Sequence, residues 1–469
     1  MDKGLTKVTP VLLDDLPTLD DKLGWEGEIQ RLKLRVEQCP TPHVLGIHGD
    51  WGAGKTSFMR QLQHSLGGEV ESGLVRKLNA QPPPEENDSV VTIWFDAWRY
   101  QHESSPIVAL LQEMRRQFSN MTKVREKFAK LSTVALQYTL DGLAGIGKAI
   151  GYEAIPNSEK IRAIGESWEK ANFHQTGQFD SLKTHLHDTI VALLPDGPTT
   201  RVVVFIDDLD RCNPKSAFKL LEGLKIYLSL PNCVFILGMN ENILLDAIRE
   251  EISAPSNASA NDIYLRASHY MEKICTDIYR LPLPKTGTEF FSKMLMEGSS
   301  SSEAAQAFML AVGDTICLPP NLRRLKALAN QWKRFSGCIV IPTDIEQQKI
   351  WAVRVLIASY IYQFHRDLWE RWHFDPDFWH ECIAWCCGER SFNADGLDTI
   401  PVWAVALKLT SKTQVGDSGA RPAWAVQYPN PSDINLFWID ELVREYRDYL
   451  LSVDFRPLLE GRQVAVETQ

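Results

Sequence analysis

Residues 49–56 of the chain read Gly49-Asp50-Trp51-Gly52-Ala53-Gly54-Lys55-Thr56. The segment has the spacing G-x-x-x-x-G-K-[ST], with an apolar run typical of a strand before it and an amphipathic pattern typical of a helix after it. Glycines let backbone N–H groups turn inward around an anion, and the positive end of the following helix favours negative charge at the same place. The segment therefore predicts a loop that binds phosphate groups.

Two side chains of this loop define the expected ligand more closely. Lys55 is placed to reach the β- and γ-phosphates of a nucleotide, and Thr56 offers a hydroxyl to a Mg²⁺ ion that bridges two phosphate oxygens. We therefore expect ATP and Mg²⁺ as cofactors. The residues expected to bind the nucleotide are Gly49, Asp50, Trp51, Gly52, Ala53, Gly54, Lys55, Thr56 and Ser57.

A second motif is an apolar run, residues 202–206, that ends in two carboxylates, Asp207 and Asp208. Asp207 is the expected acceptor for a water in the Mg²⁺ shell, and Asp208 faces the position where an attacking water is oriented or deprotonated. Successive strand residues point to opposite sides, so the two carboxylates need not share a role. Taken alone, the pair has an alternative interpretation, because acidic residues also cap helices and the ends of strands.

Polar residues follow two of the predicted strands. Ligands of an open α/β sheet sit beyond the carboxyl ends of its strands, which places Arg211 and Asn240 near the phosphates. Arg211 is expected either to neutralise charge there or to form a local salt bridge, for which Asp210 is a candidate partner. Asn240 is expected either to position water against the γ-phosphate or to cap a helix that begins at Glu241.

Short apolar runs separated by helix-length segments indicate a parallel sheet, and thus an α/β fold. The predicted strands are residues 44–48, 90–95, 202–206, 233–237 and 277–281. Residues 101–198 are too long for a normal crossover, so an inserted helical module is expected there. We expect the core to span residues 1–285, a helical lid residues 286–340, and a Trp-rich helical domain residues 341–469.

Composition limits the class of protein. The chain has 469 residues, of which 44% are hydrophobic and 23% charged, and a net charge of −10, which favours a soluble protein over a membrane protein. The negative charge disfavours nonspecific binding to nucleic acid, although a local basic patch would still allow it. Nine widely spaced cysteines and a start without an apolar stretch predict a cytoplasmic location.

Three segments together resemble the KAP family of P-loop NTPases, relatives of the AAA+ and STAND signalling ATPases. They are Gly49–Ser57, with a Trp-Gly pair inside the loop, Phe95–Tyr100, similar to the family's Phe-Asn-Ala-Trp signature, and Ile206–Cys212, which matches the family's acidic motif. The resemblance covers about residues 15–335. Many family members insert membrane helices between the nucleotide motifs, whereas the polar residues 101–198 are typical of a soluble branch.

Residues Asn321–Asn330 are similar to the family's Asn-Pro-Arg-Arg-Ile-Lys-Arg motif in the helical lid, with Leu322 in place of Pro. The resemblance implies that Arg323 contacts the nucleotide phosphates and couples hydrolysis to movement of the lid. The alternative is a basic helix face made by Arg323, Arg324 and Lys326.

The resemblance implies an ATPase that acts as a molecular switch, because family members are associated with signalling platforms and with bacterial anti-phage defence. We expect it to form a homo-oligomer and to control the assembly or activation of an effector protein. One alternative is a nucleotide-gated scaffold with negligible turnover. A further alternative is an ATPase stimulated by nucleic acid, suggested by the basic run near Arg323.

Overall fold

The structure is a computed structural model, and the residues that it describes fall into two compact units. They are residues 13–70, 89–102, 109–110, 113–114, 116–117, 200–227, 232–252, 259–275, 277–282, 287–296, 302–313, 318–375, 378–380, 383 and 439–460. The sheet unit is Leu16–Pro282, and the helical unit is Leu283–Gln469 with Met1–Asp15. Nearly all of the module predicted at residues 101–198 lies outside the described residues.

The sheet unit contains one five-stranded sheet. Its strands are β1 (His43–His48), β2 (Val90–Asp96), β3 (Arg201–Asp207), β4 (Cys233–Met239) and β5 (Asp277–Arg280). They lie in the order β2-β3-β4-β1-β5, and every neighbouring pair is parallel. The predicted α/β fold with a parallel sheet is therefore confirmed.

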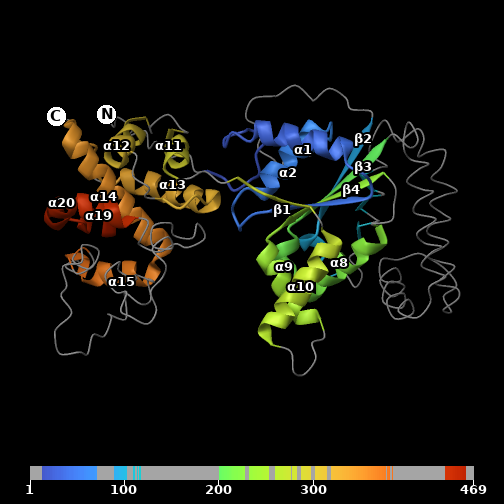
Figure 1. The fold of residues 1–469 in the computed structure, drawn as a ribbon. Helices are drawn as coiled ribbons and strands as arrows, with labels where there is room; N and C mark the ends of the chain where they lie inside the picture. The colour runs from blue at the N-terminus through green and yellow to red at the C-terminus, as the bar shows by residue number, and fades with distance from the viewer. Residues whose placement is uncertain are drawn as a thin grey trace, which may run out of the picture. The chain divides into compact units, whose positions relative to one another are not determined.

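Helices cover both faces of this sheet, as Figure 1 shows, with α1 and α2 on one face and α8, α9 and α10 on the other. The helices are α1 (Glu26–Gln38), α2 (Lys55–Ser65), α8 (Pro214–Tyr227), α9 (Glu241–Glu251) and α10 (Ala260–Ile274), with the short 3₁₀ helices η1 (Trp98–Tyr100) and η3 (Leu209–Arg211). Because the sheet is covered twice, residues 202–206 of β3 are fully buried. This explains why that run is apolar without alternation.

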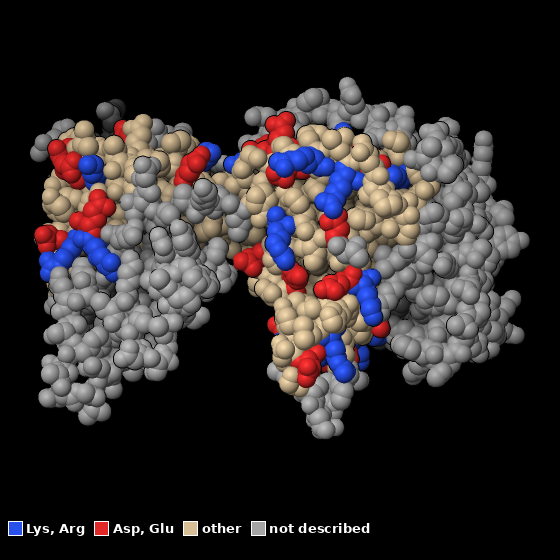
Figure 2. All heavy atoms as spheres, in the orientation of Figure 1, with Lys and Arg blue, Asp and Glu red and all other residues tan. Residues whose placement is uncertain are grey.

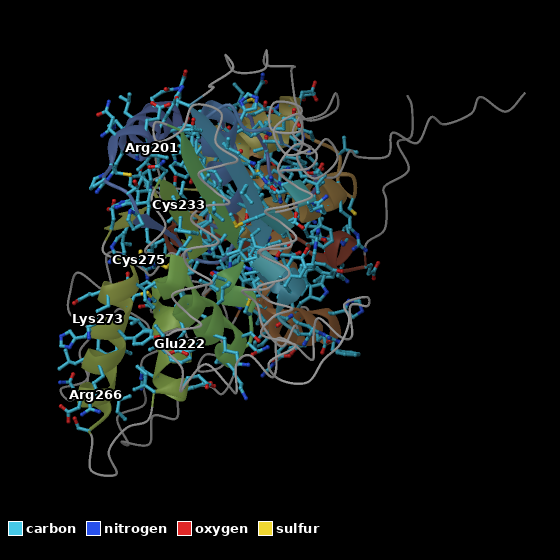
Figure 3. The ribbon with its side chains drawn as sticks, turned by 90° about the vertical axis from the view of Figure 1, so that its right-hand side faces the viewer. Arg201, Glu222, Cys233, Arg266, Lys273 and Cys275 are labelled. Atoms are coloured by element: carbon cyan, nitrogen blue, oxygen red, sulfur yellow. The ribbon has the colours of Figure 1, made fainter. Side chains whose placement is uncertain are left out.

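Helices α8 and α10 lie next to each other in the layer below the sheet (Figure 3). Tyr270 of α10 donates a hydrogen bond to Glu222 of α8 at 3.3 Å. Helix α10 begins with a capping box, in which the Ser259 hydroxyl accepts from the Asp262 amide at 3.2 Å. Local capping and this cross-helix contact hold the layer together.

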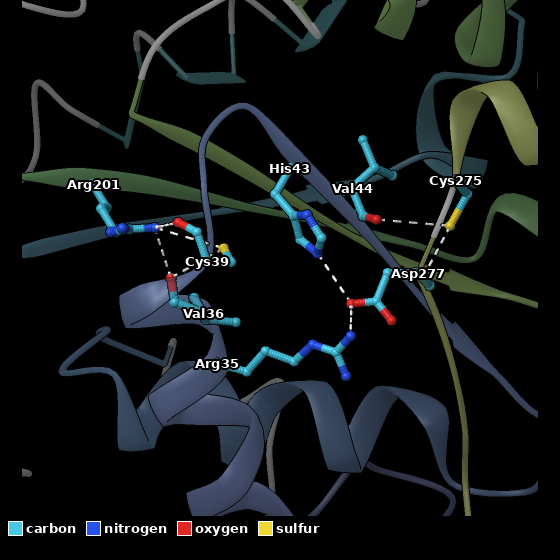
Figure 4. A network of polar contacts seen from close by, with 8 residues as sticks. All are labelled: Arg35, Val36, Cys39, His43, Val44, Arg201, Cys275 and Asp277. Atoms are coloured by element: carbon cyan, nitrogen blue, oxygen red, sulfur yellow. Dashed lines mark hydrogen bonds and ion pairs between the residues drawn. The ribbon is translucent and has the colours of Figure 1, made fainter.

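A network of polar contacts ties the starts of the strands to helix α1 (Figure 4). Arg201, at the start of β3, donates to the carbonyl oxygen of Cys39 at 2.7 Å, where its charge suits the carboxyl end of α1. Asp277, at the start of β5, pairs with Arg35 at 2.7 Å and with His43 at 3.0 Å. The charged groups at this end of the sheet are thus matched with partners inside the protein.

The described part of the helical unit is built around aromatic side chains. Its helices are α11 (Thr288–Met296), α12 (Ser302–Val312), α13 (Leu322–Ser336), α14 (Ile345–Phe364), α15 (Arg366–Phe374), α19 (Asp440–Glu445), α20 (Arg447–Ser452) and α21 (Arg456–Leu459). Trp332 is buried, with its ring centroid 5.6 Å from that of Phe308 and 5.8 Å from that of Trp351. The predicted bounds of a lid and a separate C-terminal domain stay predictions.

Candidate functional site

The predicted phosphate-binding loop connects the end of β1 to the start of α2 at Lys55. Gly52 and Gly54 have φ angles of 84° and 95°, in the left-handed region that other residues rarely adopt. A Cβ on Gly49 would lie 3.2 Å from a methyl carbon of Leu281. The turn therefore favours glycine at positions 52 and 54, and the packing at Gly49 leaves little room for a side chain.

Lys55 is buried in this loop, and three oxygen atoms surround its ammonium group. Nζ donates to the carbonyl oxygens of Gly49 at 2.9 Å and Asp50 at 3.3 Å, and it lies 3.1 Å from Oδ2 of Asp210. The side chains of Lys55 and Asp210 are only 7% and 3% exposed. The structure thus brings the cation of the loop against a carboxylate from the segment that follows β3.

Asp207, the last residue of β3, lies next to the loop. It is 4% exposed and accepts a hydrogen bond from the side chain of Thr56, so the two predicted metal residues meet. Burial raises the pKa of Asp207, and its Oδ1 atom has no hydrogen-bond partner among the described residues. A Cβ on Gly238 would lie 2.8 Å from this oxygen, so a larger residue in the neighbouring strand would force Asp207 or Met59 to shift.

Asp208 turns away from the strand, because its backbone is left-handed with a φ of 56°. Burial and the adjacent charge of Asp207 raise the pKa of Asp208 to about 7, against the opposing effect of Arg211. Nε of Arg211 lies 3.0 Å from Oδ1 of Asp208. The local salt bridge considered for Arg211 is therefore present, but its partner is Asp208, whereas Asp210 pairs with Lys55.

Arg211 also lies near the exposed aromatic residue of the loop. The guanidinium carbon is 5.8 Å from the ring centroid of Trp51, whose side chain is 61% exposed. That distance is within the range of cation–π attraction. Trp51 and Arg211, which were both predicted to belong to the site, therefore lie close to each other.

Asn240 follows β4 and serves as the N-cap of α9. Its Oδ1 atom accepts from the amides of Asn242 at 3.1 Å and Ile243 at 3.5 Å. Its Nδ2 atom donates to Oδ1 of Asp50 in the phosphate-binding loop at 3.2 Å. The capping interpretation of Asn240 is thus realised, and the same side chain also anchors the loop.

Arg323 belongs to the helical unit, near the start of α13. Its Nε atom lies 2.8 Å from Oδ2 of Asp15, and its side chain is 41% exposed. Asn321 caps this helix by accepting from the amide of Arg324 at 3.2 Å. A role of Arg323 in contacting phosphate stays a prediction.

Two carboxylates of the site have roles that the sequence did not predict, since Asp96 received none and Asp210 was considered only as a partner of Arg211. Asp96 ends β2 in register with Asp207, and its negative charge helps to raise the pKa of both Asp207 and Asp208. Asp210 is the ion-pair partner of Lys55. Asp96 could have been found from its position at a strand end, and Asp210 from its place one short turn after Asp207.

The residues at this site fit a nucleotide with Mg²⁺. Within the described ranges, no group of three or more His, Cys, Asp or Glu side chains could hold a metal ion. Mg²⁺, however, is usually bound through one or two carboxylates together with substrate phosphates and water. Thr56 and the buried, unpartnered oxygen of Asp207 supply such a partial set of ligands.

Among the helices that the structure describes, none combines the length and the apolar character needed to cross a membrane.

Comparisons with known proteins place the chain in a family. A search of curated proteins gives no match for the chain. The KAP family P-loop domain matches residues 29–337, which is more than half of the sequence and includes the loop, the ends of β2, β3 and β4, and helix α13. The chain therefore belongs to the KAP family of P-loop NTPases.

Proposed function

We propose that the chain binds ATP with Mg²⁺ and hydrolyses it as a molecular switch. The observation that carries the proposal is the meeting of Lys55, Thr56 and Asp207 beyond the carboxyl ends of β1 and β3. This is the edge of a parallel sheet where ligands bind. Lys55 supplies a charge for the phosphates, and Thr56 with Asp207 would hold the Mg²⁺ shell, in which bound Mg²⁺ neutralises phosphate charge.

Asp208 is the proposed general base. A pKa of about 7 suits a group that accepts a proton from water near neutral pH. At that pH a large fraction of the Asp208 carboxyl groups is ionised, and the carboxylate is more basic than an ordinary one. Its pairing with Arg211 stabilises the ionised form. We propose that Arg211 and Asn240 position these groups, and that Arg323 contacts the phosphates from the helical unit.

The test is release of phosphate by the purified full chain with ATP and Mg²⁺. We expect turnover in the wild type, and a loss of at least about a hundredfold in both Lys55→Ala and Asp208→Asn. Nucleotide binding should be lost in the first variant and retained in the second. Absence of turnover in the wild type, in every oligomeric and partner-bound form tested, would reject an ATPase.

The proposed output is control of an effector protein in a defence or signalling complex in the cytoplasm. The support is membership of the family together with the candidate nucleotide site, which suits a protein that changes state with its nucleotide. We propose that a homo-oligomer is the working form. Light scattering of the chain with and without ATP and Mg²⁺ should show a change in mass. An equal mass under all conditions would reject assembly of a homo-oligomer in response to the nucleotide.

A nucleotide-gated scaffold is the second candidate, and one observation favours it. Arg211 forms an ion pair with the carboxylate of Asp208, so the proposed base is not free to accept a proton from water. A scaffold would need ATP binding and hardly any turnover. It predicts that Asp208→Asn keeps the biological function while Lys55→Ala destroys it, and equal loss in both variants would reject it.

Stimulation by nucleic acid has weaker support. On the face of the molecule shown in Figure 2, blue Lys and Arg side chains are interspersed with red Asp and Glu side chains over the described residues. Binding to a phosphate backbone favours clustered basic residues. Turnover that is unchanged by added DNA or RNA would remove this candidate.

A further inference from the structure

The short helix η3 (Leu209–Arg211) contributes one partner to each of two ion pairs at the site. Asp210 lies 3.1 Å from Nζ of Lys55, and Arg211 lies 3.0 Å from Oδ1 of Asp208. Lys55 and Asp208 are the two residues on which phosphate binding and water activation are proposed to depend. One turn of three residues therefore engages both functional groups at once.

The ammonium group of Lys55 lies among protein oxygens. Two of its three N–H groups are donated to the carbonyl oxygens of Gly49 and Asp50, and its charge is paired with the carboxylate of Asp210 at 3.1 Å in an ion pair that lacks hydrogen-bond geometry. A phosphate that binds Lys55 must therefore compete with this carboxylate for the positive charge. A nucleotide competes with groups of the protein for this cation.

Asp210 is the acceptor that a phosphate would displace. The two carbonyl oxygens belong to the backbone of the loop itself, whereas Asp210 reaches Lys55 through a side chain from another segment. Asp210 is also the only anion among the three oxygen-bearing groups around Lys55, so an incoming phosphate repels it and not the neutral carbonyls. A buried ammonium needs a compensating negative charge, and the phosphate supplies the charge that Asp210 gives up.

The turn is built so that movement of Asp210 reaches Arg211. Leu209 is fully buried in the core of the sheet unit and anchors the turn at one end. Two backbone hydrogen bonds close the turn, from Arg211 N to Asp208 O at 3.1 Å and from Cys212 N to Leu209 O at 3.3 Å. Asp210 and Arg211 are neighbours in this closed turn, so a displacement that moves the backbone of Asp210 would also load these bonds and shift Arg211 relative to Asp208.

We propose that Asp210 is a positioning residue that holds Lys55 and competes with the nucleotide phosphates for it, and that its displacement loosens the hold of Arg211 on Asp208. Phosphate binding and release of the base are then coupled through η3. This inference rests on the proposed binding of ATP at the same loop. It assigns to Asp210 a role that opposes binding, so removing its charge should help the ligand.

The experiment compares nucleotide affinity in the wild type and in Asp210→Asn, which keeps the shape of the side chain and removes its charge. The probe is a slowly hydrolysed ATP analogue with Mg²⁺, measured by isothermal titration of the full chain. We expect the Kd to fall by about tenfold, because Lys55 is left without its counter-charge. Asp246→Asn is the matched control, since Asp246 pairs with Arg249 on the surface of the same unit at 2.8 Å, and its Kd should not change.

The outcomes separate this inference from the proposed function. A wild type that binds the analogue while Asp210→Asn binds it equally or more weakly overturns the role of Asp210 and leaves ATP binding intact. Failure of both proteins to bind overturns both. Binding by Asp210→Asn alone, or a tighter Kd in that variant, supports the competition, since a purely structural role would weaken binding.

Hydrogen exchange in the wild type decides the question if Asp210→Asn does not fold. The amides of Arg211 and Cys212 are the donors that close the turn. Addition of the analogue with Mg²⁺ should speed their exchange, while the amides of the phosphate-binding loop become slower to exchange. Slower or unchanged exchange at Arg211 and Cys212, with protection of the loop, would contradict displacement of the turn.

Discussion

The two ends of the five-stranded sheet contain the same kinds of charged residues and use them differently. At the start of the strands, Asp277 pairs with Arg35 and His43, and Arg201 is held by carbonyl oxygens of α1. At the carboxyl ends, Asp207 has a buried oxygen without a hydrogen-bond partner among the described residues, and Asp208 has a pKa raised to about 7.

The difference shows that burial of charge destabilises the folded protein mainly at the carboxyl ends of the strands. A buried carboxylate without full compensation destabilises the folded chain, so it persists where a ligand completes it. At the other end the described charges are matched, so no such cost arises there. Charge that is buried and incompletely matched therefore locates the site within the sheet better than charge as such.

The largest expected effect is on ATP affinity and comes from removing Lys55, the cation at the carboxyl end of the sheet. Lys55→Ala removes the charge that faces the phosphates, so ATP affinity should fall by at least about a hundredfold. Arg201→Ala, which removes a half-buried charge from the opposite end, should leave the Kd for ATP unchanged. Equilibrium titration of both variants checks this, and equal losses of affinity would show that the two ends do not differ in role.

A smaller loss of turnover is expected from a substitution that crowds Oδ1 of Asp207, the buried oxygen without a hydrogen-bond partner among the described residues. Gly238→Ala would place a methyl group 2.8 Å from Oδ1 of Asp207 and 2.7 Å from the sulfur of Met59. Both neighbours must shift, so turnover should fall by about tenfold through disturbance of the proposed metal site. Gly27→Ala in α1 is the control, because a Cβ there meets no atom within 4 Å. Unchanged Mg²⁺ dependence in Gly238→Ala would contradict the assignment of Asp207.

The raised pKa of Asp208 predicts an unusual pH dependence of stability. Between its ordinary value of 3.8 and about 7, the folded chain retains a proton that the unfolded chain releases. Asp208 therefore makes the protein less stable as pH rises through this window, by on the order of 1–2 kcal/mol for a partly exposed group. Denaturation curves from pH 4 to 8 without Mg²⁺ should show that Asp208→Asn reduces this slope.

The smallest effect concerns the matched end. Arg201→Ala should lower the free energy of unfolding by about 1–2 kcal/mol, because carbonyl oxygens at the end of α1 lose their donor. Turnover per folded molecule should stay as in the wild type. A denaturant melt combined with an activity assay gives both numbers, and lost turnover in a stably folded variant would assign this end a part in function.

The sequence predicted the sheet well, because apolar runs and turn residues are local signals. All five strands lie within two residues of their predicted bounds, and the loop begins and ends where its glycines indicated. The approach of Thr56 to Asp207 at the end of β3 followed from the family motif and from the rule that ligands meet strand ends.

The partners of Arg211 and Lys55 were not predictable in the same way. Alternation along a strand ceases at Asp208, whose left-handed backbone turns its carboxylate toward Arg211 and leaves Asp210 to Lys55. Which acid pairs with which base depends here on the backbone angle of Asp208 and on the approach of Lys55 from a segment far away in the sequence. For Asn240, the capping interpretation is realised, its contact with Asp50 of the loop was not predicted, and a role in positioning water stays a prediction.

The most direct test of the account is titration of ATP into the wild type and Asp207→Asn, each with Mg²⁺ and with EDTA. The account predicts that Mg²⁺ strengthens binding to the wild type by at least about tenfold and that this difference disappears in Asp207→Asn, which keeps the hydrogen-bonding shape without the charge. An equal Mg²⁺ effect in both proteins would contradict the claim that the carboxyl end of the sheet is reserved for a metal–nucleotide complex.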